Sequence, residues 1–153
     1  MKLYLVQHGE ACSRDIDPER PLTDQGRADT DRLVGFLGQA GIRVQRVIHS
    51  GKLRAAQTAQ QLAVVLAPAV EPERSSMLDP NDDPGAFDLE TDQDRDTLVV
   101  GHLPFMSKLV SLLVTEDESR LVTAYQPGSI VCLEHDNGTR WHINWMVRPE
   151  LLR

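Results

Sequence analysis

Short apolar runs alternate with longer segments of helical periodicity along most of the chain. The apolar runs are typical of buried β-strands, and the segments between them carry apolar residues at the three- and four-residue spacing of an α-helix. The expected strands are residues 2–7, 44–49 and 97–101, and the expected helices are residues 24–40, 52–66 and 103–114. This order is typical of an α/β fold with three layers, in which a mostly parallel central sheet has helices on both faces.

Two further apolar stretches, residues 129–134 and 140–147, flank an Asn-Gly pair at 137–138 that favours a tight turn. They predict a C-terminal β-hairpin, which adds an antiparallel edge to the sheet. Trp141 and Trp145 lie four positions apart in the second stretch. In a regular strand both would lie on one face, and we expect them to be part of the core.

Composition excludes several classes of function. The chain has 153 residues, 41% of them hydrophobic, and we expect a single domain spanning residues 1–153. A net charge of −7 argues against binding to nucleic acid or to an anionic membrane. No apolar run is long enough for a signal peptide or a membrane span, so the expected location is the cytoplasm. The spacing of the cysteines and histidines fits no disulfide framework or metal site, and no cofactor is expected.

Chemically competent side chains follow each of the first three expected strands. The first strand ends at Gln7-His8-Gly9, the second is followed by Arg54, and the third by His102. Because the carboxyl ends of parallel strands meet at one edge of the sheet, we expect His8, Arg54 and His102 to lie together. A neutral imidazole is a competent nucleophile, a guanidinium binds phosphate oxygens, and a second imidazole can add positive charge. The set therefore predicts phosphoryl transfer.

These residues stand in four motifs that resemble those of the histidine phosphatase (phosphoglycerate mutase-like) superfamily. In chain order the motifs are Leu5-Val6-Gln7-His8-Gly9-Glu10-Ala11, Arg20-Pro21-Leu22-Thr23 followed by Gly26, Ser50 through Leu53-Arg54-Ala55 to Gln57-Thr58-Ala59, and Val100-Gly101-His102-Leu103-Pro104. The resemblance spans nearly the whole chain and implies a phosphoglycerate mutase-like fold. It also implies that His8 is the nucleophile, that Arg54 binds phosphate and that His102 stabilises the transferring group.

The resemblance further implies that Gln7, Gly9 and Arg20 bind substrate, with Arg20 at the rim of the site. In the family an arginine precedes the nucleophilic histidine, whereas this chain has Gln7 there. Glutamine can donate a hydrogen bond to a phosphate oxygen but carries no charge. We expect the loss of one charge-assisted contact to weaken affinity or rate by about 10- to 100-fold.

Larger members of the family insert a lid domain between the second and third motifs, where this chain has only the polar residues 71–96. We expect an ordered loop there, an open cleft, and similarity to the small SixA-type phosphohistidine phosphatases. The expected reaction passes through a phosphohistidine on the enzyme. The expected substrate is a phosphorylated protein, such as a histidine-containing phosphotransfer domain. Two alternatives stay open: a small-molecule phosphomonoesterase, and a phosphate- or phosphohistidine-binding module whose catalysis is weakened by Gln7.

Other polar residues near the motifs have simpler interpretations. Ser50 either bonds to the site or caps the following helix, and the cap is the preferred interpretation. Cys12 lies near His8 in the sequence, but nothing specifies the base that a catalytic cysteine needs. His49, His135 and His142 are expected to be structural or exposed.

Overall fold

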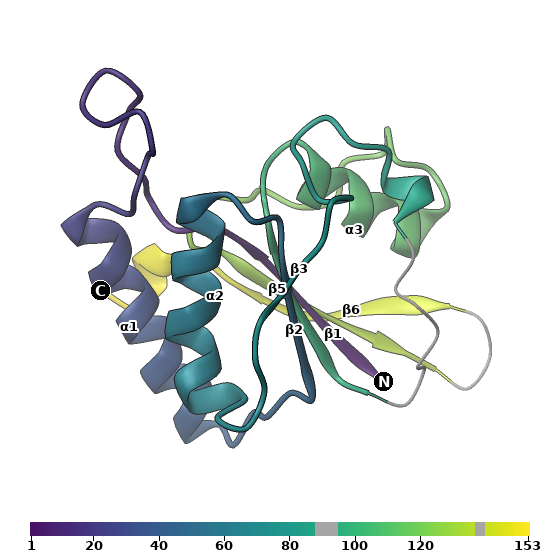
Figure 1. Ribbon diagram of the computed structural model, residues 1–153. Coiled ribbons are helices and arrows are strands. Elements are labelled where there is room, and N and C mark those ends of the chain that lie inside the picture. The colour runs from purple at the N-terminus through teal and green to yellow at the C-terminus, as the bar shows by residue number, and fades with distance from the viewer. Residues whose placement is uncertain (88–94, 137–139) are drawn as a thin grey trace.

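The computed structural model describes residues 1–87, 95–136 and 140–153, and its centre is a six-stranded sheet (Figure 1). The strands are β1 (Lys2–Gln7), β2 (Arg46–His49), β3 (Glu73–Arg74), β4 (Thr97–Gly101), β5 (Ile130–His135) and β6 (Trp141–Val147). Their order in the sheet is β3-β2-β4-β1-β5-β6. Neighbours from β3 to β1 are parallel, and β5 and β6 add the antiparallel edge. The predicted fold class and both hairpin strands are confirmed, while the predicted turn at 137–138 lies outside the described residues.

Helices cover both faces of the sheet. The α-helices are α1 (Asp24–Gln39), α2 (Leu53–Leu66) and α3 (Phe105–Thr115), and the short 3-10 helices are η1 (Pro84–Ala86) and η2 (Pro149–Leu151). Helices α1 and α2 lie on one face, and α3 lies on the other (Figure 1). No helix in the described part of the chain is long and apolar enough to cross a membrane.

Local signals explain where the elements begin and end. Helix α1 starts after Thr23, whose hydroxyl accepts a hydrogen bond from the Gly26 N–H at 3.0 Å. The chain leaves this helix through Gly41, which has a φ of +73°. Strand β2 is shorter than predicted because the N–H of Val44 bonds to the carbonyl of Leu66 at the end of α2, not to a neighbouring strand.

The core has two parts because β1 is buried on both faces. Tyr4 and Val6 pack in the cluster beneath α1 and α2, whereas Leu3 and Leu5 pack in the cluster beneath α3. Successive side chains of a strand point to opposite faces, so a strand that is covered on both sides needs a continuous apolar run. This burial fixes the position of the loop that follows β1.

The two tryptophans of β6 lie on opposite faces, so the prediction of a shared face was wrong. Adjacent residues Cys132 and Leu133 of β5 pair with residues two apart in β6, which leaves Asn144 as an extra residue. This β-bulge reverses the alternation of side chains along β6. Trp145 therefore packs against the α1–α2 cluster and Trp141 against the α3 cluster.

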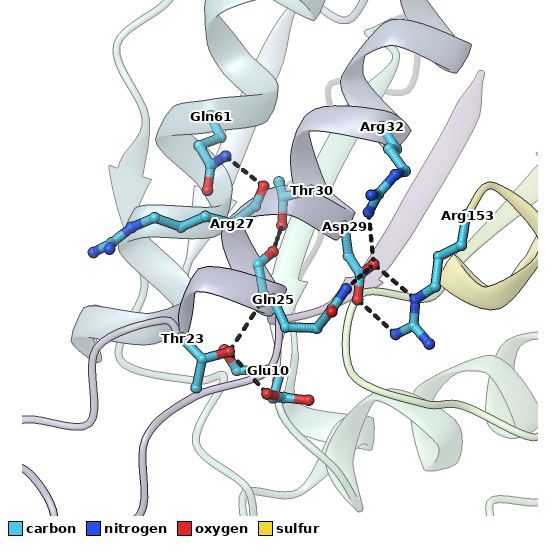
Figure 2. Close-up of polar contacts among 10 residues, drawn as sticks. Glu10, Thr23, Gln25, Arg27, Asp29, Thr30, Arg32, Gln61 and Arg153 are labelled. Atoms are coloured by element: carbon cyan, nitrogen blue, oxygen red, sulfur yellow. Dashed lines mark hydrogen bonds and ion pairs between the residues drawn. The ribbon is translucent and has the colours of Figure 1, made fainter.

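A buried carboxylate ties the C-terminal residue to α1. Asp29 accepts hydrogen bonds from Nε and Nη2 of Arg153 at 3.0 and 2.9 Å, and from Nε2 of Gln25 at 2.9 Å (Figure 2). Its side chain is only 3% exposed. The hydrogen bonds from Arg153 hold the pKa of Asp29 below its usual value. Folding therefore favours the ionised carboxylate, and the contact stabilises α1 beside the end of the chain.

The segment between α2 and β4 contains β3 and η1 and is otherwise irregular in the residues that the structure describes. Residues 88–94 lie outside the described part. Within residues 71–87 and 95–96 there is no lid domain, as the sequence predicts.

Candidate functional site

His8 and His102 follow neighbouring parallel strands. Gln7 at the end of β1 pairs with Gly101 at the end of β4, and the His8 N–H donates to the Gly101 carbonyl at 3.0 Å. The centroids of the two imidazole rings lie 5.0 Å apart. Arg54 reaches the same place from the first turn of α2, with its Nε 3.4 Å from Nε2 of His8. The structure thus brings together the three side chains that the sequence predicts to meet.

The hydrogen bonds of His8 determine which ring nitrogen is free. Nδ1 lies 2.7 Å from the Gly9 carbonyl oxygen. A carbonyl only accepts, so Nδ1 carries the hydrogen and Nε2 keeps its lone pair. Nε2 is the nitrogen beside the Arg54 guanidinium. An unprotonated imidazole nitrogen next to a fixed positive charge is suited to attack the electrophilic centre of an anion.

Both imidazoles are neutral at physiological pH in the unliganded site. Burial lowers the pKa of His8 to about 4, and the charges of Arg54 and Arg20 lower it too, against the opposing effect of the Gly9 carbonyl. Burial also lowers the pKa of His102 to about 3, assisted by His8 and Arg54. Neutrality keeps His8 nucleophilic. A bound dianion would raise both values and favour a protonated His102.

Positive charge is concentrated at this edge although the whole chain carries −7. The charge of Arg20 acts on His8, Arg54 and His102, and that of Lys52 acts on His102. Arg20 has a left-handed backbone with a φ of +51°, and its Nε donates to the Cys12 carbonyl at 3.0 Å. Such a conformation is uncommon for arginine and persists where the surrounding structure holds the residue in place.

Gly9 and Gln7, on either side of His8 in the sequence, are both buried. The Gly9 N–H donates to Oγ1 of Thr58 at 3.0 Å, so this amide is already paired. A Cβ at Gly9 would lie 3.1 to 3.2 Å from atoms of Leu22, Gly26 and Thr30, so the residue must be small for the chain to pack there. The side chain of Gln7 is buried, and its Oε1 has no hydrogen-bond partner among the described residues.

Ser50 and Thr58 both hold this arrangement, whereas the sequence interpretation preferred a capping role for Ser50 and gave Thr58 none. Oγ of Ser50 lies 2.6 Å from Nε2 of His102, and the residue that caps α2 is Lys52, with no side-chain hydrogen bond. The preference for Ser50 as a cap was therefore wrong. Thr58 accepts the Gly9 N–H while donating to the Arg54 carbonyl at 2.8 Å. The four-residue spacing of Arg54 and Thr58 was the available signal for Thr58, since it places both on one side of α2. For Ser50, which precedes the helix, the signal was its place directly after β2, at the edge of the sheet where the site lies.

The described residues of the site do not resemble a metal centre. Among residues 1–87, 95–136 and 140–153, no group of three or more histidine, cysteine or acidic side chains could hold a metal ion. What the site offers is a neutral nucleophile, two guanidinium groups and a second imidazole.

Comparison with known proteins agrees with this geometry. Residues 3–77 match the family model described as the histidine phosphatase superfamily (branch 1). The chain is 28% identical over 155 residues to the phosphohistidine phosphatase SixA of Escherichia coli (strain K12), across 97% of this chain and 94% of that protein. It is 35% identical over 113 residues to an uncharacterized protein of Picosynechococcus sp., across 68% of this chain and 67% of that protein.

The chain belongs to the histidine phosphatase superfamily. The resemblance stated from the motifs is thereby confirmed, and as a member of this superfamily the protein is a phosphatase.

Solved structures of the histidine phosphatase superfamily share the fold. The structure of the protein histidine phosphatase SixA complexed with tungstate superposes with a TM-score of 0.86 at 25% identity, over 100% of both chains. A putative phosphohistidine phosphatase SixA from Agrobacterium tumefaciens gives 0.76 at 21% identity, over 97% of both chains. At 21% identity, the second comparison is evidence for the fold only.

Proposed function

We propose that the protein dephosphorylates phosphohistidine in a protein substrate, such as a histidine-containing phosphotransfer domain, through a phosphorylated His8. The observation that carries the proposal is the unprotonated Nε2 of His8, which lies beside Arg54 and next to the His102 ring. The similarity to the phosphohistidine phosphatase SixA of Escherichia coli supports the substrate class.

The reaction needs two transfers at one phosphorus atom. Nε2 of His8 attacks the phosphorus, the bond to the substrate imidazole breaks, and that imidazole takes up a proton. Water then attacks phosphorylated His8, which releases inorganic phosphate and restores the neutral ring. Arg54 and Arg20 would neutralise the oxygens during both transfers, and His102 would donate a hydrogen bond to one of them.

The leaving group explains why so simple a site suffices. An imidazole is protonated with a pKa of about 6.5, far below that of an alcohol, so it leaves without a strong general acid. Leu103 follows His102 where a proton donor would otherwise be expected, and its side chain is exposed. A phosphohistidine substrate therefore fits the residues present better than a phosphate ester does.

The surroundings of the site suit a protein surface. Leu53 and Leu103, each adjacent in sequence to a proposed site residue, are exposed, as is Met77 beyond β3. Leu53 directly follows the cation Lys52. Exposed apolar side chains together with a cation would match an acidic protein surface with apolar residues around its phosphohistidine.

The substrate class is tested by comparing kcat/KM for a phosphohistidine-containing phosphotransfer protein, a phosphoserine peptide and a sugar phosphate. We expect a preference of at least about 100-fold for the phosphohistidine protein, because ester leaving groups need a strong general acid and an imidazole does not. A preference for either ester would contradict the substrate class. Tight binding of tungstate without turnover of any of the three substrates would instead favour a phosphate-binding module.

The residue at position 7 leads to a separate prediction, because an arginine there would restore the charge that the family signature carries. We expect Gln7→Arg to raise kcat/KM by about 10- to 100-fold, the effect of one added charge-assisted hydrogen bond to phosphate. Gln7→Met, of similar length but without an amide, is the matched control and should not raise it. Unchanged or lower turnover in Gln7→Arg would show that the electrostatic deficit at position 7 does not limit the enzyme.

A further inference from the structure

We infer, on the basis of the proposed function, that Ser50 is a positioning residue whose hydroxyl fixes the hydrogen of neutral His102 on Nδ1, where it can be donated to the transferring phosphoryl group. Ser50 acts through His102 and does not need to touch the substrate.

The two residues meet because their strands are neighbours in the sheet. His49 at the end of β2 pairs with Val100 of β4, so the residues just beyond them come side by side. Ser50 is 4% exposed and His102 is 2% exposed, so water does not compete for their contact. The distance of 2.6 Å between Oγ and Nε2 is that of a strong hydrogen bond.

The other contact of Ser50 leaves its hydroxyl hydrogen free to be donated. The Lys52 N–H points to Oγ at 3.4 Å, a weak contact that uses the oxygen as an acceptor. A hydroxyl has only one hydrogen to give, and here it is available for Nε2 of His102. A neutral imidazole carries a single hydrogen, so the ring that accepts at Nε2 holds its hydrogen on Nδ1.

The resulting N–H group is poised for a ligand. Nδ1 of His102 is buried and has no hydrogen-bond partner within the described part of the chain. Buried donors without partners are rare in native proteins, and they often mark functional sites. The ring lies 5.0 Å from that of His8, so an oxygen of a phosphoryl group in transfer to His8 is the acceptor that fits. In the opposite tautomer Nδ1 would turn a lone pair toward that anion.

A hydroxyl suits both charge states of the second histidine. When a phosphate dianion favours the protonated ring, both nitrogens carry hydrogens, and the Ser50 oxygen can then accept from Nε2. The side chain needs only to rotate its O–H bond. Alanine offers neither contact, whereas threonine offers both.

Kinetics of three variants test this role. We expect Ser50→Ala to lower kcat by about 10- to 100-fold with KM changed less than about threefold, because the lost contact acts in the transition state. Ser50→Thr should restore most of the rate. The matched control is Ser111→Ala, since Ser111 is buried in α3 and its hydroxyl donates only to the Ser107 carbonyl of the same helix. It should leave kcat unchanged.

The tautomer itself is read by NMR of protein labelled with ¹⁵N-histidine, without substrate. In the wild type the hydrogen of His102 should reside on Nδ1, and in Ser50→Ala it should move wholly or partly to Nε2. A wild-type hydrogen on Nε2, or an unchanged tautomer in Ser50→Ala, would overturn the inference. The wild-type spectrum needs no variant to fold and no turnover. A chain that lacks His8-dependent hydrolysis would therefore refute the proposed function while leaving the role of Ser50 separately testable.

Discussion

Replacement of His8 by alanine should abolish hydrolysis, with a loss of at least about 10⁴-fold in kcat. The physical reason is that Nε2 of His8 is the nucleophile of the proposed reaction, held with a free lone pair by the hydrogen bond from Nδ1 to the Gly9 carbonyl. Without it, water must attack the substrate directly. Steady-state rates with a phosphohistidine protein measure the loss, and rapid acid-free quenching with labelled substrate should trap phosphate on His8 of the wild type only.

The matched control for His8→Ala is His142→Ala. Nε2 of His142 on β6 lies 3.0 Å from Oδ2 of Asp136, which directly follows β5. This contact is near the amino end of β1 and away from the site. This variant should keep the wild-type rate. A His8→Ala protein that folds normally and retains more than about one hundredth of the activity would show that another group is the nucleophile.

Gly26→Ala should destabilise the protein by at least about 2 kcal/mol and impair catalysis as well. A Cβ at this position would lie 2.2 Å from the Glu10 carbonyl oxygen and 3.0 Å from the Glu10 nitrogen. Both atoms belong to the backbone, which cannot rotate away as a side chain can. The same carbonyl accepts the Thr23 N–H at 2.9 Å, and the Glu10 carboxylate accepts the Thr23 hydroxyl, so the contact joins α1 to the loop that follows His8 (Figure 2). Urea unfolding measures the loss.

Gly35→Ala in the same helix is the control for Gly26→Ala. No atom lies within 4 Å of the Cβ that would be added at Gly35. Alanine is a better helix former than glycine, so this variant should gain about 0.5 to 1 kcal/mol. The two substitutions are chemically the same and differ in what the methyl group meets. Equal stability of the two variants would show that the loop after His8 yields to α1 at little cost.

The chain's local patterns were enough to determine the elements and the edge of the sheet where the chemistry lies. Continuous apolar runs predicted β1 and β4 with their observed bounds, and Thr23 predicted the start of α1. These signals are local, because hydrophobic periodicity and capping depend on residues a few positions apart. The convergence of His8, Arg54 and His102 followed from a general property of parallel sheets, and the motifs that carry them gave the family.

What only the tertiary structure decided are the contacts between distant segments. The pairing of Ser50 with His102, the use of the Gly9 amide by Thr58 and the opposite faces of Trp141 and Trp145 were predicted wrongly or not at all. Each depends on the relative placement of two strands, or of a strand and a helix, to within a fraction of an ångström. A single inserted residue, as at Asn144, reverses a strand's faces, and the pairing of β2 with β4 brings Ser50 to His102. These outcomes depend on packing between residues that are far apart along the chain.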